Sequence, residues 1–287
     1  MTDLPRRLST SALLITLVLS TLFVFPIWAF AAVVAGFIAL ALYEFFTMVR
    51  QRGILVRRPL GVALGVIFTA LVAWRSLVVD GHLAVPIAGE GATVLTWAWD
   101  IFWPLTIVLI FLRQFTRQNT FEALSGLATT LFGLAYIPGL LSYLFYLRTF
   151  KEQPGAWLVL FLILVTKMGD AGAFFIGKLM GRHTLIARIS PRKTVEGFVG
   201  GVLVSAVTAA LAASMVVRFQ GSPMSGFLVG LALGLWGQLG DLAESLIKRD
   251  CQVKDSGAWL PGLGGVLDIL DSLLFTAPLF YGFLIYP

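Results

Sequence analysis

A short segment near residue 240 carries acidic, hydroxyl and basic side chains at helical spacing. Asp241, Glu244, Ser245 and Lys248 occupy positions i, i+3, i+4 and i+7. A helix would therefore place two carboxylates, a hydroxyl and an ammonium group on one stripe. The flanking residues are apolar, so these charged groups are costly to keep there. The stripe is a candidate site for binding or catalysis.

A second acidic group follows directly. Lys254 to Gly257 reads Lys-Asp-Ser-Gly, Pro261 to Gly265 is rich in glycine, and Asp268 and Asp271 stand three residues apart at the start of the last apolar run. Carboxylates from two adjacent helices repel one another unless a cation lies between them. Mg²⁺ takes one or two protein carboxylates and leaves its other positions to water and substrate phosphates. Paired acidic groups of this kind therefore suit Mg²⁺.

Basic residues accompany the acidic ones. Arg192, Lys193, Lys248 and Lys254 would repel a bare metal ion but attract a triphosphate. A metal with a polyanionic nucleotide therefore accounts for both signs of charge. A proton or cation pathway through paired acids, as in transporters, is the alternative. That alternative leaves the basic residues without a role.

The loop Ser190 to Gly197 places Arg192 and Lys193 beside hydroxyl groups at the start of a predicted helix. Free backbone N–H groups and the helix dipole favour phosphate at such a position. An ordinary basic loop before a capped helix is an equally good interpretation.

Lys167 and Asp170 lie inside an apolar run, three residues apart, and would share a helix face. The pair is either a neutralised structural ion pair or part of a site, and both interpretations stay open.

The elements that must hold these residues are membrane helices. The chain has 287 residues, of which 58% are hydrophobic and 13% charged, which excludes an ordinary water-soluble domain. About 20 apolar residues are needed to cross roughly 30 Å of hydrocarbon. The apolar runs are too long and uniform for the alternating strands of a membrane barrel. We therefore predict an all-α polytopic transmembrane protein.

About nine spans are predicted from the apolar runs, and Pro26 marks the first tight turn. The predicted spans are Ser11 to Phe25, Ile27 to Met48, Leu60 to Trp74, Thr93 to Leu112, Ala123 to Leu147, Trp157 to Gly177, Phe198 to Val217, Ser225 to Ile247 and Val266 to Tyr286.

The distribution of the 21 Lys and Arg residues predicts the orientation. With a cytoplasmic N-terminus, most of them fall in inside loops, and the outside loops hold Arg75, Arg148, Lys151 and Arg218. An odd number of spans places the termini on opposite sides. We expect one membrane domain over residues 1–287, with scaffold helices in 1–150 and the catalytic helices and cytoplasmic loops in 157–287.

The charged segments together resemble a known family. The resemblance is carried by Ser245 to Arg249, Lys254 to Gly257, Pro261 to Gly265 and Asp268 to Asp271, preceded by Gly169 to Phe174 with Gly177, Ser190 to Gly197 and, more weakly, Glu44. In this order they resemble the motifs of phosphatidate cytidylyltransferases, also called CDP-diacylglycerol synthases. The likeness extends from about Lys167 to the C-terminus.

The resemblance implies transfer of a cytidylyl group from CTP to phosphatidic acid, with release of pyrophosphate. The catalytic residues it implies are Asp241, Asp268, Asp271, Lys248, Lys254 and Asp255. The substrate-binding residues it implies are Ser190, Arg192, Lys193, Thr194, Glu196, Ser245, Arg249, Ser256, Gly262, Gly264, Gly265, Asp170 and Glu244. Mg²⁺ is expected on Asp241, Asp268 and Asp271, and a second cation such as K⁺ stays open.

The resemblance also implies CTP, phosphatidic acid and membrane lipids as partners, a homodimer, and no nucleic acid. It implies a bacterial inner membrane with the active site facing the cytoplasm.

Two positions depart from the family pattern. Leu263 stands where the family usually has His, and Ile269 stands where it usually has Arg. Two donors that can carry charge are thereby missing from a phosphate-handling region.

Two alternative functions stay open. They are a CTP-dependent transferase acting on another lipid, such as an isoprenoid, and an ion-coupled transporter. The spaced aspartates of CDP-alcohol phosphotransferases are absent from the sequence.

Overall fold

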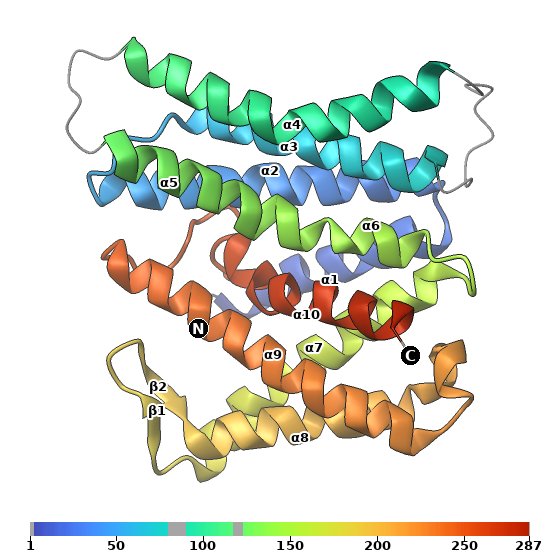
Figure 1. Cartoon of the computed structure of the whole chain (residues 1–287). Helices are drawn as coiled ribbons and strands as arrows, with labels where there is room; N and C mark the ends of the chain where they lie inside the picture. Colours follow the sequence, from blue (N-terminus) through green and yellow to red (C-terminus); the bar gives the residue numbers. More distant parts are fainter. Residues whose placement is uncertain (1–2, 80–89, 117–122, 287) are drawn as a thin grey trace. The chain divides into compact units, whose positions relative to one another are not determined.

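The structure is a computed structural model that describes residues 3–79, 90–116 and 123–286. The chain divides into two compact units. Unit 1 consists of Met1–Phe145 with Ser256–Leu267, and unit 2 consists of Tyr146–Asp255 with Asp268–Pro287. Figure 1 shows the order of the elements along the chain.

Unit 1 is built around one buried helix. Its elements are α1 (Asp3–Phe23), α2 (Ile27–Gln51), α3 (Arg58–Trp74), the π-helical turn η1 (Arg75–Val79), α4 (Glu90–Phe115), α5 (Ala123–Leu134) and the π-helical turn η2 (Ala135–Gly139). Helix α2 packs against α3 and α5. Ile38, Leu42, Phe45 and Phe46 of α2 recur at helical spacing and are almost fully buried, so they form the core of the unit.

Unit 2 contains the longest described helix, α9, which has 28 residues. Its elements are α7 (Gly155–Met180), β1 (Thr184–Ile186), β2 (Ser190–Thr194), α8 (Val195–Leu211), the 3₁₀ turns η3 (Ala213–Met215) and η4 (Val217–Phe219), α9 (Pro223–Asp250) and α10 (Leu267–Ile285). The short helix α6 (Tyr143–Arg148) and the first residue of α10 fall at the boundaries between the units. Helix α8 packs against both α7 and α9.

Glycines set the close packing of α8 against α9. A Cβ atom at Gly230 would lie 2.6 Å from the Ala209 Cβ, and one at Gly234 would lie 2.8 Å from the Ser205 Cβ. Real Cβ atoms do not approach so closely, and small residues are the usual means by which membrane helices pack tightly. Helices α8 and α9 therefore form a fixed frame for the side chains that they carry.

A two-stranded hairpin leads into α8. Strands β1 and β2 are antiparallel, with Thr184 opposite Thr194, and the Thr194 hydroxyl then accepts a hydrogen bond from the Gly197 amide at 3.1 Å. This is the N-cap of α8. The segment Ser190–Thr194 was predicted as a loop before a helix, so the helix start is confirmed and the strand pairing is an addition.

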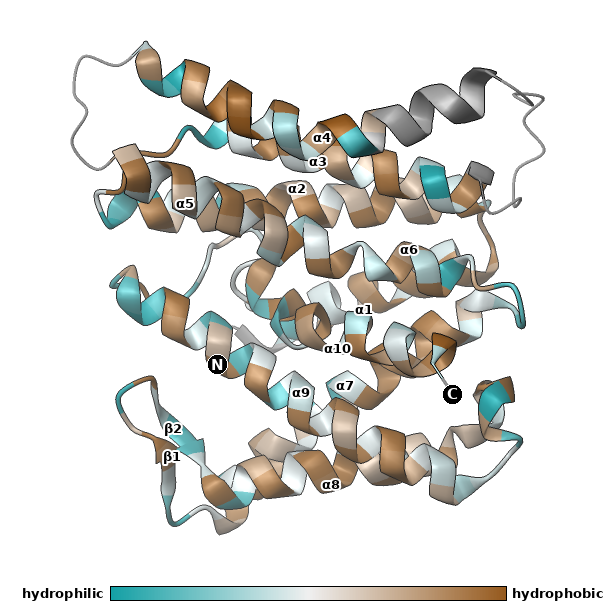
Figure 2. Cartoon of the chain, viewed as in Figure 1, coloured by the Kyte–Doolittle hydropathy of each residue, from teal (hydrophilic) through white to brown (hydrophobic). Residues whose placement is uncertain are grey.

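Seven described helical segments are long and apolar enough to cross a membrane. They begin at Pro5, Ile27, Arg58, Ala123, Gly155, Pro223 and Leu267. The predicted all-α polytopic class is confirmed, whereas the number nine is not. Helix α8 is apolar but has 17 residues, about 26 Å at 1.5 Å per residue. Figure 2 shows many apolar residues along helices such as α2, α7 and α8.

Two predicted spans compare differently with the helices that form. The predicted span Ala123 to Leu147 is confirmed, because Ala123–Arg148 is one helical segment of membrane length. The π-helical turn η2 within it contains Pro138, which cannot donate a helical hydrogen bond. The predicted span Phe198 to Val217 ends as a helix at Leu211. Past that residue the chain turns back through η3 and η4 to the Ser222 cap of α9.

Candidate active site

A polar pocket opens within unit 2 among α7, β2, α8 and α9. Its volume is about 420 Å³, within the range of small-molecule sites. Its charged lining residues are Asp170, Lys178, Arg192, Lys193 and Asp241. Three cationic groups and two carboxylates thus line one cavity, which suits a polyanion bound together with a divalent cation.

The pocket joins two of the segments singled out in the sequence. Lys193 Nζ at the end of β2 lies 2.6 Å from Asp241 Oδ2 in α9. Both side chains are mostly shielded from solvent. The Asp241 Oδ1 atom is also 3.5 Å from the Ser245 hydroxyl. The basic loop and the acidic stripe, predicted separately, therefore meet in three dimensions.

Next to the pocket residue Asp170, Lys167 is held in a half-buried network of hydrogen bonds. Its Nζ atom donates to Asp170 Oδ2 at 3.0 Å, to the Ile269 carbonyl at 2.7 Å and to the Ser272 hydroxyl at 3.0 Å. The Ser272 hydroxyl in turn donates to Asp170 Oδ2 at 2.9 Å. The predicted pairing of Lys167 with Asp170 is confirmed. Ile269 contributes its carbonyl oxygen, where the family pattern has an arginine.

Asp271 belongs to the same charged region. It is 6% exposed, and its Oδ1 atom accepts a hydrogen bond from the Ser272 amide at 2.6 Å. Lys167, Asp170 and Asp241 all lie within electrostatic range of it. Lys167 therefore interacts electrostatically with three carboxylates of unit 2.

A second ionic cluster involves the other half of the acidic stripe. Lys248 forms an ion pair with Glu244, one turn earlier on α9. Its Nζ atom also donates to Asp268 Oδ1 at 2.7 Å. Glu244 is fully buried, so removal of the ammonium group would leave uncompensated negative charge in the interior. None of these three residues lines the polar pocket.

In unit 1, Glu44 holds the glycine-rich segment. Its carboxylate accepts hydrogen bonds from the Ser256 hydroxyl at 3.0 Å, the Val266 amide at 2.9 Å and the Leu267 amide at 2.8 Å. Glu44 is 2% exposed. The last two donors are backbone groups at the start of α10, so Glu44 supplies that helix with a cap from a different part of the chain.

The predicted glycine sites have a conformational role in unit 1. Gly262 and Gly264 have φ of 80° and 99°, where an L side chain is strained. A Cβ at Gly265 would overlap the Ser256 hydroxyl and lie 2.7 Å from Glu44 Oε2. These glycines therefore allow the segment to close around the Glu44 carboxylate.

Four further predicted residues, Lys254, Asp255, Arg249 and Glu196, lie outside the pocket lining. Lys254 and Asp255 are exposed. Arg249 Nε donates to the Ile189 carbonyl at 3.1 Å, which ties α9 to the hairpin. The Glu196 carboxylate accepts from the Arg182 and His183 amides at 3.1 and 3.3 Å.

Thr194 and Gln238 are two further lining residues of the pocket. Thr194 lines the pocket as well as capping α8. Gln238 also lines it and is 4% exposed. Gln238 was not predicted, although it precedes Asp241 by three residues and therefore shares its helix face. Ser190 pairs with Ile186 in the hairpin and is not among the lining residues.

The carboxylates of the pocket bear on the expected Mg²⁺ site. Among the described residues, no three His, Cys, Asp or Glu side chains are grouped to hold a metal ion. Two carboxylates, Asp170 and Asp241, line the pocket together with cations suited to phosphate. Mg²⁺ needs only one or two protein carboxylates when substrate phosphates complete its coordination. The pocket therefore fits Mg²⁺ delivered with a nucleotide.

Seven helices of membrane length among the described residues, together with a charged pocket within unit 2, define an integral membrane protein. The sequence profile described as "Cytidylyltransferase family" matches residues 5–286. The chain belongs to this family, and the resemblance noted in the sequence is confirmed.

Three relatives show how far the similarity reaches. A phosphatidate cytidylyltransferase of Synechocystis sp. is 36% identical over 284 residues, 90% of this chain and 89% of the relative. One of Staphylococcus epidermidis is 42% identical over 162 residues, 56% of this chain and 60% of the relative. An uncharacterized protein of Escherichia coli is 40% identical over 161 residues, 56% of this chain and 52% of the relative.

Proposed function

We propose that this protein transfers the cytidylyl group of CTP to phosphatidic acid, forming CDP-diacylglycerol and pyrophosphate. The observation that carries the proposal is the polar pocket of unit 2, where Arg192, Lys193 and Asp241 meet. Family membership and the printed activity of the Synechocystis relative support the same reaction.

The reaction asks the protein mainly to bring two polyanions together. A phosphate oxygen of phosphatidic acid attacks the α-phosphorus of CTP, and the bond from that phosphorus to the bridging oxygen breaks as pyrophosphate leaves. The attacking oxygen is already anionic, so no strong general base is needed. Positioning and charge stabilisation are then the main sources of rate acceleration.

The pocket residues have distinct roles in this scheme. Lys178, Arg192 and Lys193 bind phosphate oxygens. The start of α8, next to Thr194, adds backbone N–H groups that favour phosphate. Lys167, tied to Asp170, keeps that carboxylate oriented along the pocket wall.

Mg²⁺ would be held by Asp241 and Asp170, with the charge of Asp271 nearby. When bound, it neutralises charge on the triphosphate and on the pyrophosphate leaving group. The wider ligand set Asp241, Asp268 and Asp271 stays a prediction, as does K⁺.

We place the pocket on the cytoplasmic side of a bacterial inner membrane. The support is the density of Arg and Lys in the segments around it, residues 178–193 and 248–254, since such residues mark cytoplasmic loops. A homodimer remains an expectation from the resemblance.

The test is product analysis with purified protein, CTP and Mg²⁺, supplied with phosphatidic acid, with an isoprenyl phosphate, or with no lipid. We expect CDP-diacylglycerol and pyrophosphate with phosphatidic acid alone. A product formed only with isoprenyl phosphate would support the alternative of a CTP-dependent transferase acting on another lipid. This alternative is included because Leu263 and Ile269 depart from the family pattern. An absence of lipid-dependent pyrophosphate release in every arm would reject both.

A further inference from the structure

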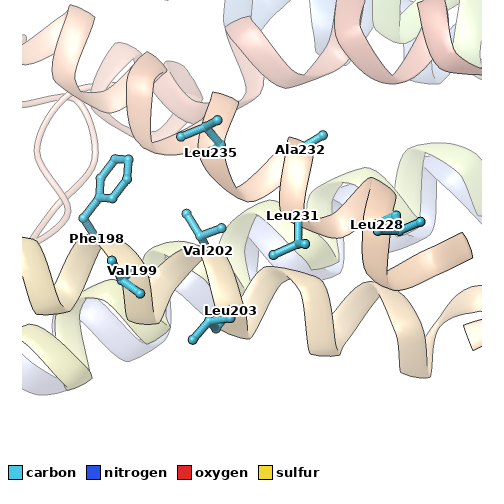
Figure 3. Close-up of a pocket in the computed structure, with 8 residues that line it drawn as sticks. All are labelled: Phe198, Val199, Val202, Leu203, Leu228, Leu231, Ala232 and Leu235. Carbon is cyan, nitrogen blue, oxygen red and sulfur yellow. The ribbon is translucent and has the colours of Figure 1, made fainter. Parts of the chain in front are cut away.

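An apolar groove runs between α8 and α9 within unit 2. Its volume is about 440 Å³. Its lining side chains are all hydrocarbon and come from these two helices: Phe198, Val199, Val202, Leu203, Leu228, Leu231, Ala232 and Leu235. Figure 3 shows Val202 and Leu231 between the two helices, with Phe198 and Leu235 toward one end of the set and Leu228 at the other.

The groove continues the polar pocket along the same pair of helices. Phe198 lines both cavities. On α9, Leu228, Leu231 and Leu235 of the groove are followed by Gln238 and Asp241 of the polar pocket. These five residues are three or four positions apart, so they lie on one helix face. Along this face of α9, the lining side chains are apolar from Leu228 to Leu235 and become polar at Gln238 and charged at Asp241.

A polar pocket that joins an apolar groove matches an amphiphile with a phosphate head. We propose that the groove between α8 and α9 binds one acyl chain of the lipid substrate while its phosphate occupies the polar pocket. This inference rests on the proposed function, and it names the part of the protein that recognises the lipid chain. The groove places the phosphate near Lys193 and Asp241 with the chain directed along α9.

The dimensions of the groove favour a single chain over a protein segment. From Leu228 to Leu235 the groove follows α9 for about 10 Å at 1.5 Å per residue. Gly230 and Gly234 bring α8 close to α9, so the space between them is narrow, whereas a helix with its side chains is about 10–12 Å wide. Val199 and Leu203 are 50% and 48% exposed, so a chain can enter from the side.

Helix α8 offers a matched pair of residues for the test. Val199 lines the groove and is 50% exposed, whereas Val207, two turns further on, is 51% exposed and does not line it. We expect Val199→Trp to raise the KM for dioleoyl phosphatidic acid roughly tenfold, the effect of losing contacts to about two methylene groups. The KM for CTP should change little. Val207→Trp should alter neither constant.

A binding measurement separates this inference from the proposed reaction. The wild-type protein in phosphatidylcholine vesicles is mixed with phosphatidic acid carrying a diazirine on one acyl chain, irradiated, and digested for peptide mapping. We expect cross-links on the segments containing Leu203 and Leu228, weakened by excess unlabelled phosphatidic acid and by Val199→Trp.

The outcomes are distinguishable. Phosphatidylcholine carrying the same diazirine should label these segments much less. Equal labelling by both lipids, or cross-links confined to other helices, would overturn the inference by showing a general lipid surface. Cross-linking as expected in a protein that makes no CDP-diacylglycerol would keep the groove and reject the proposed reaction.

Discussion

At the scale of single residues, Asp241 is the carboxylate on which the account depends most. It lines the polar pocket and lies 2.6 Å from Lys193. Asp241→Asn keeps the shape of the side chain but removes the charge that would hold Mg²⁺. We expect cytidylyl transfer to fall by at least about 10²-fold, the usual cost of losing one electrostatic group at a reacting centre. Steady-state rates with phosphatidic acid and CTP measure the loss.

Asp250 provides the matched control, because it lies on the same helix and is exposed outside the pocket. Asp250→Asn should retain the wild-type rate. Wild-type turnover in Asp241→Asn, in protein with an unchanged melting temperature, would remove Asp241 from the site.

We expect the hydrogen bonds that Glu196 accepts to depend on pH. Hydrogen bonds from the Arg182 amide and the His183 ring, with further backbone donors, lower the pKa of Glu196 from 4.5 to about 2. Because the folded-state pKa is lowered, its support of the hairpin is complete above about pH 4.5 and is lost as the pH falls toward 2. Hydrogen exchange of the Arg182 and His183 amides, corrected for intrinsic rates, should show protection that disappears within this window. Loss of protection already between pH 7 and 5 would contradict the assignment.

Some residue-level features were predictable and others were not. The spacing of Lys167 and Asp170 was enough to predict their pairing, because residues three apart on a helix are neighbours. Spacing could not predict that residues of the stripe from Asp241 to Lys248 pair with partners from different segments. Asp241 faces Lys193 while Lys248 faces Asp268, and these partners come from segments distant in the sequence.

At the scale of elements, Glu44 fixes the start of α10. Its carboxylate accepts three hydrogen bonds from the segment between Ser256 and Leu267. Glu44→Gln leaves too few acceptor positions for these buried donors. We expect a loss of about 1–3 kcal/mol in unfolding free energy, together with faster hydrogen exchange at Val266 and Leu267. Thermal unfolding in detergent and amide exchange measure both effects.

The exposed Glu152 serves as the control for that substitution. Glu152→Gln should leave stability and exchange unchanged. Equal behaviour of the two variants would show that the Glu44 hydrogen bonds do not hold the segment.

The cluster of Glu244, Lys248 and Asp268, on helices α9 and α10, is expected to contribute to the stability of the protein. Lys248→Met would leave the fully buried Glu244 without its cation, at a cost of about 3–5 kcal/mol. Adding Glu244→Gln to the same protein should recover part of this loss, since the uncompensated charge is removed. The four proteins of this double-mutant cycle, compared by denaturant unfolding, give the coupling energy. Additive losses would mean that the two side chains act independently.

The elements themselves were largely predictable from hydropathy, because long apolar runs must form helices in lipid. The fifth predicted span forms as one helical segment, and the π-helical turn within it occurs at Pro138, a local irregularity that hydropathy does not predict. The β1–β2 hairpin has no such signal. Its strands have three and five residues, too few for an alternating pattern to be distinguished from a loop.

At the scale of the whole molecule, two compact units share the predicted site residues. Ser256, Gly262, Gly264 and Gly265 belong to unit 1, and the other predicted residues belong to unit 2. The polar pocket and the apolar groove both lie within unit 2. The family motifs therefore combine residues that form a cavity with residues that shape the chain around Glu44, and a motif alone does not separate these roles.

The central claim is that the protein splits CTP between its α- and β-phosphates and passes the cytidylyl group to a lipid. The direct test supplies purified protein, Mg²⁺ and phosphatidic acid with CTP labelled at either the α- or the γ-phosphate. The account predicts that the α-label moves into the organic phase as CDP-diacylglycerol, while the γ-label stays in water as pyrophosphate. Retention of both labels in intact CTP, or transfer of the γ-label to lipid, would contradict it.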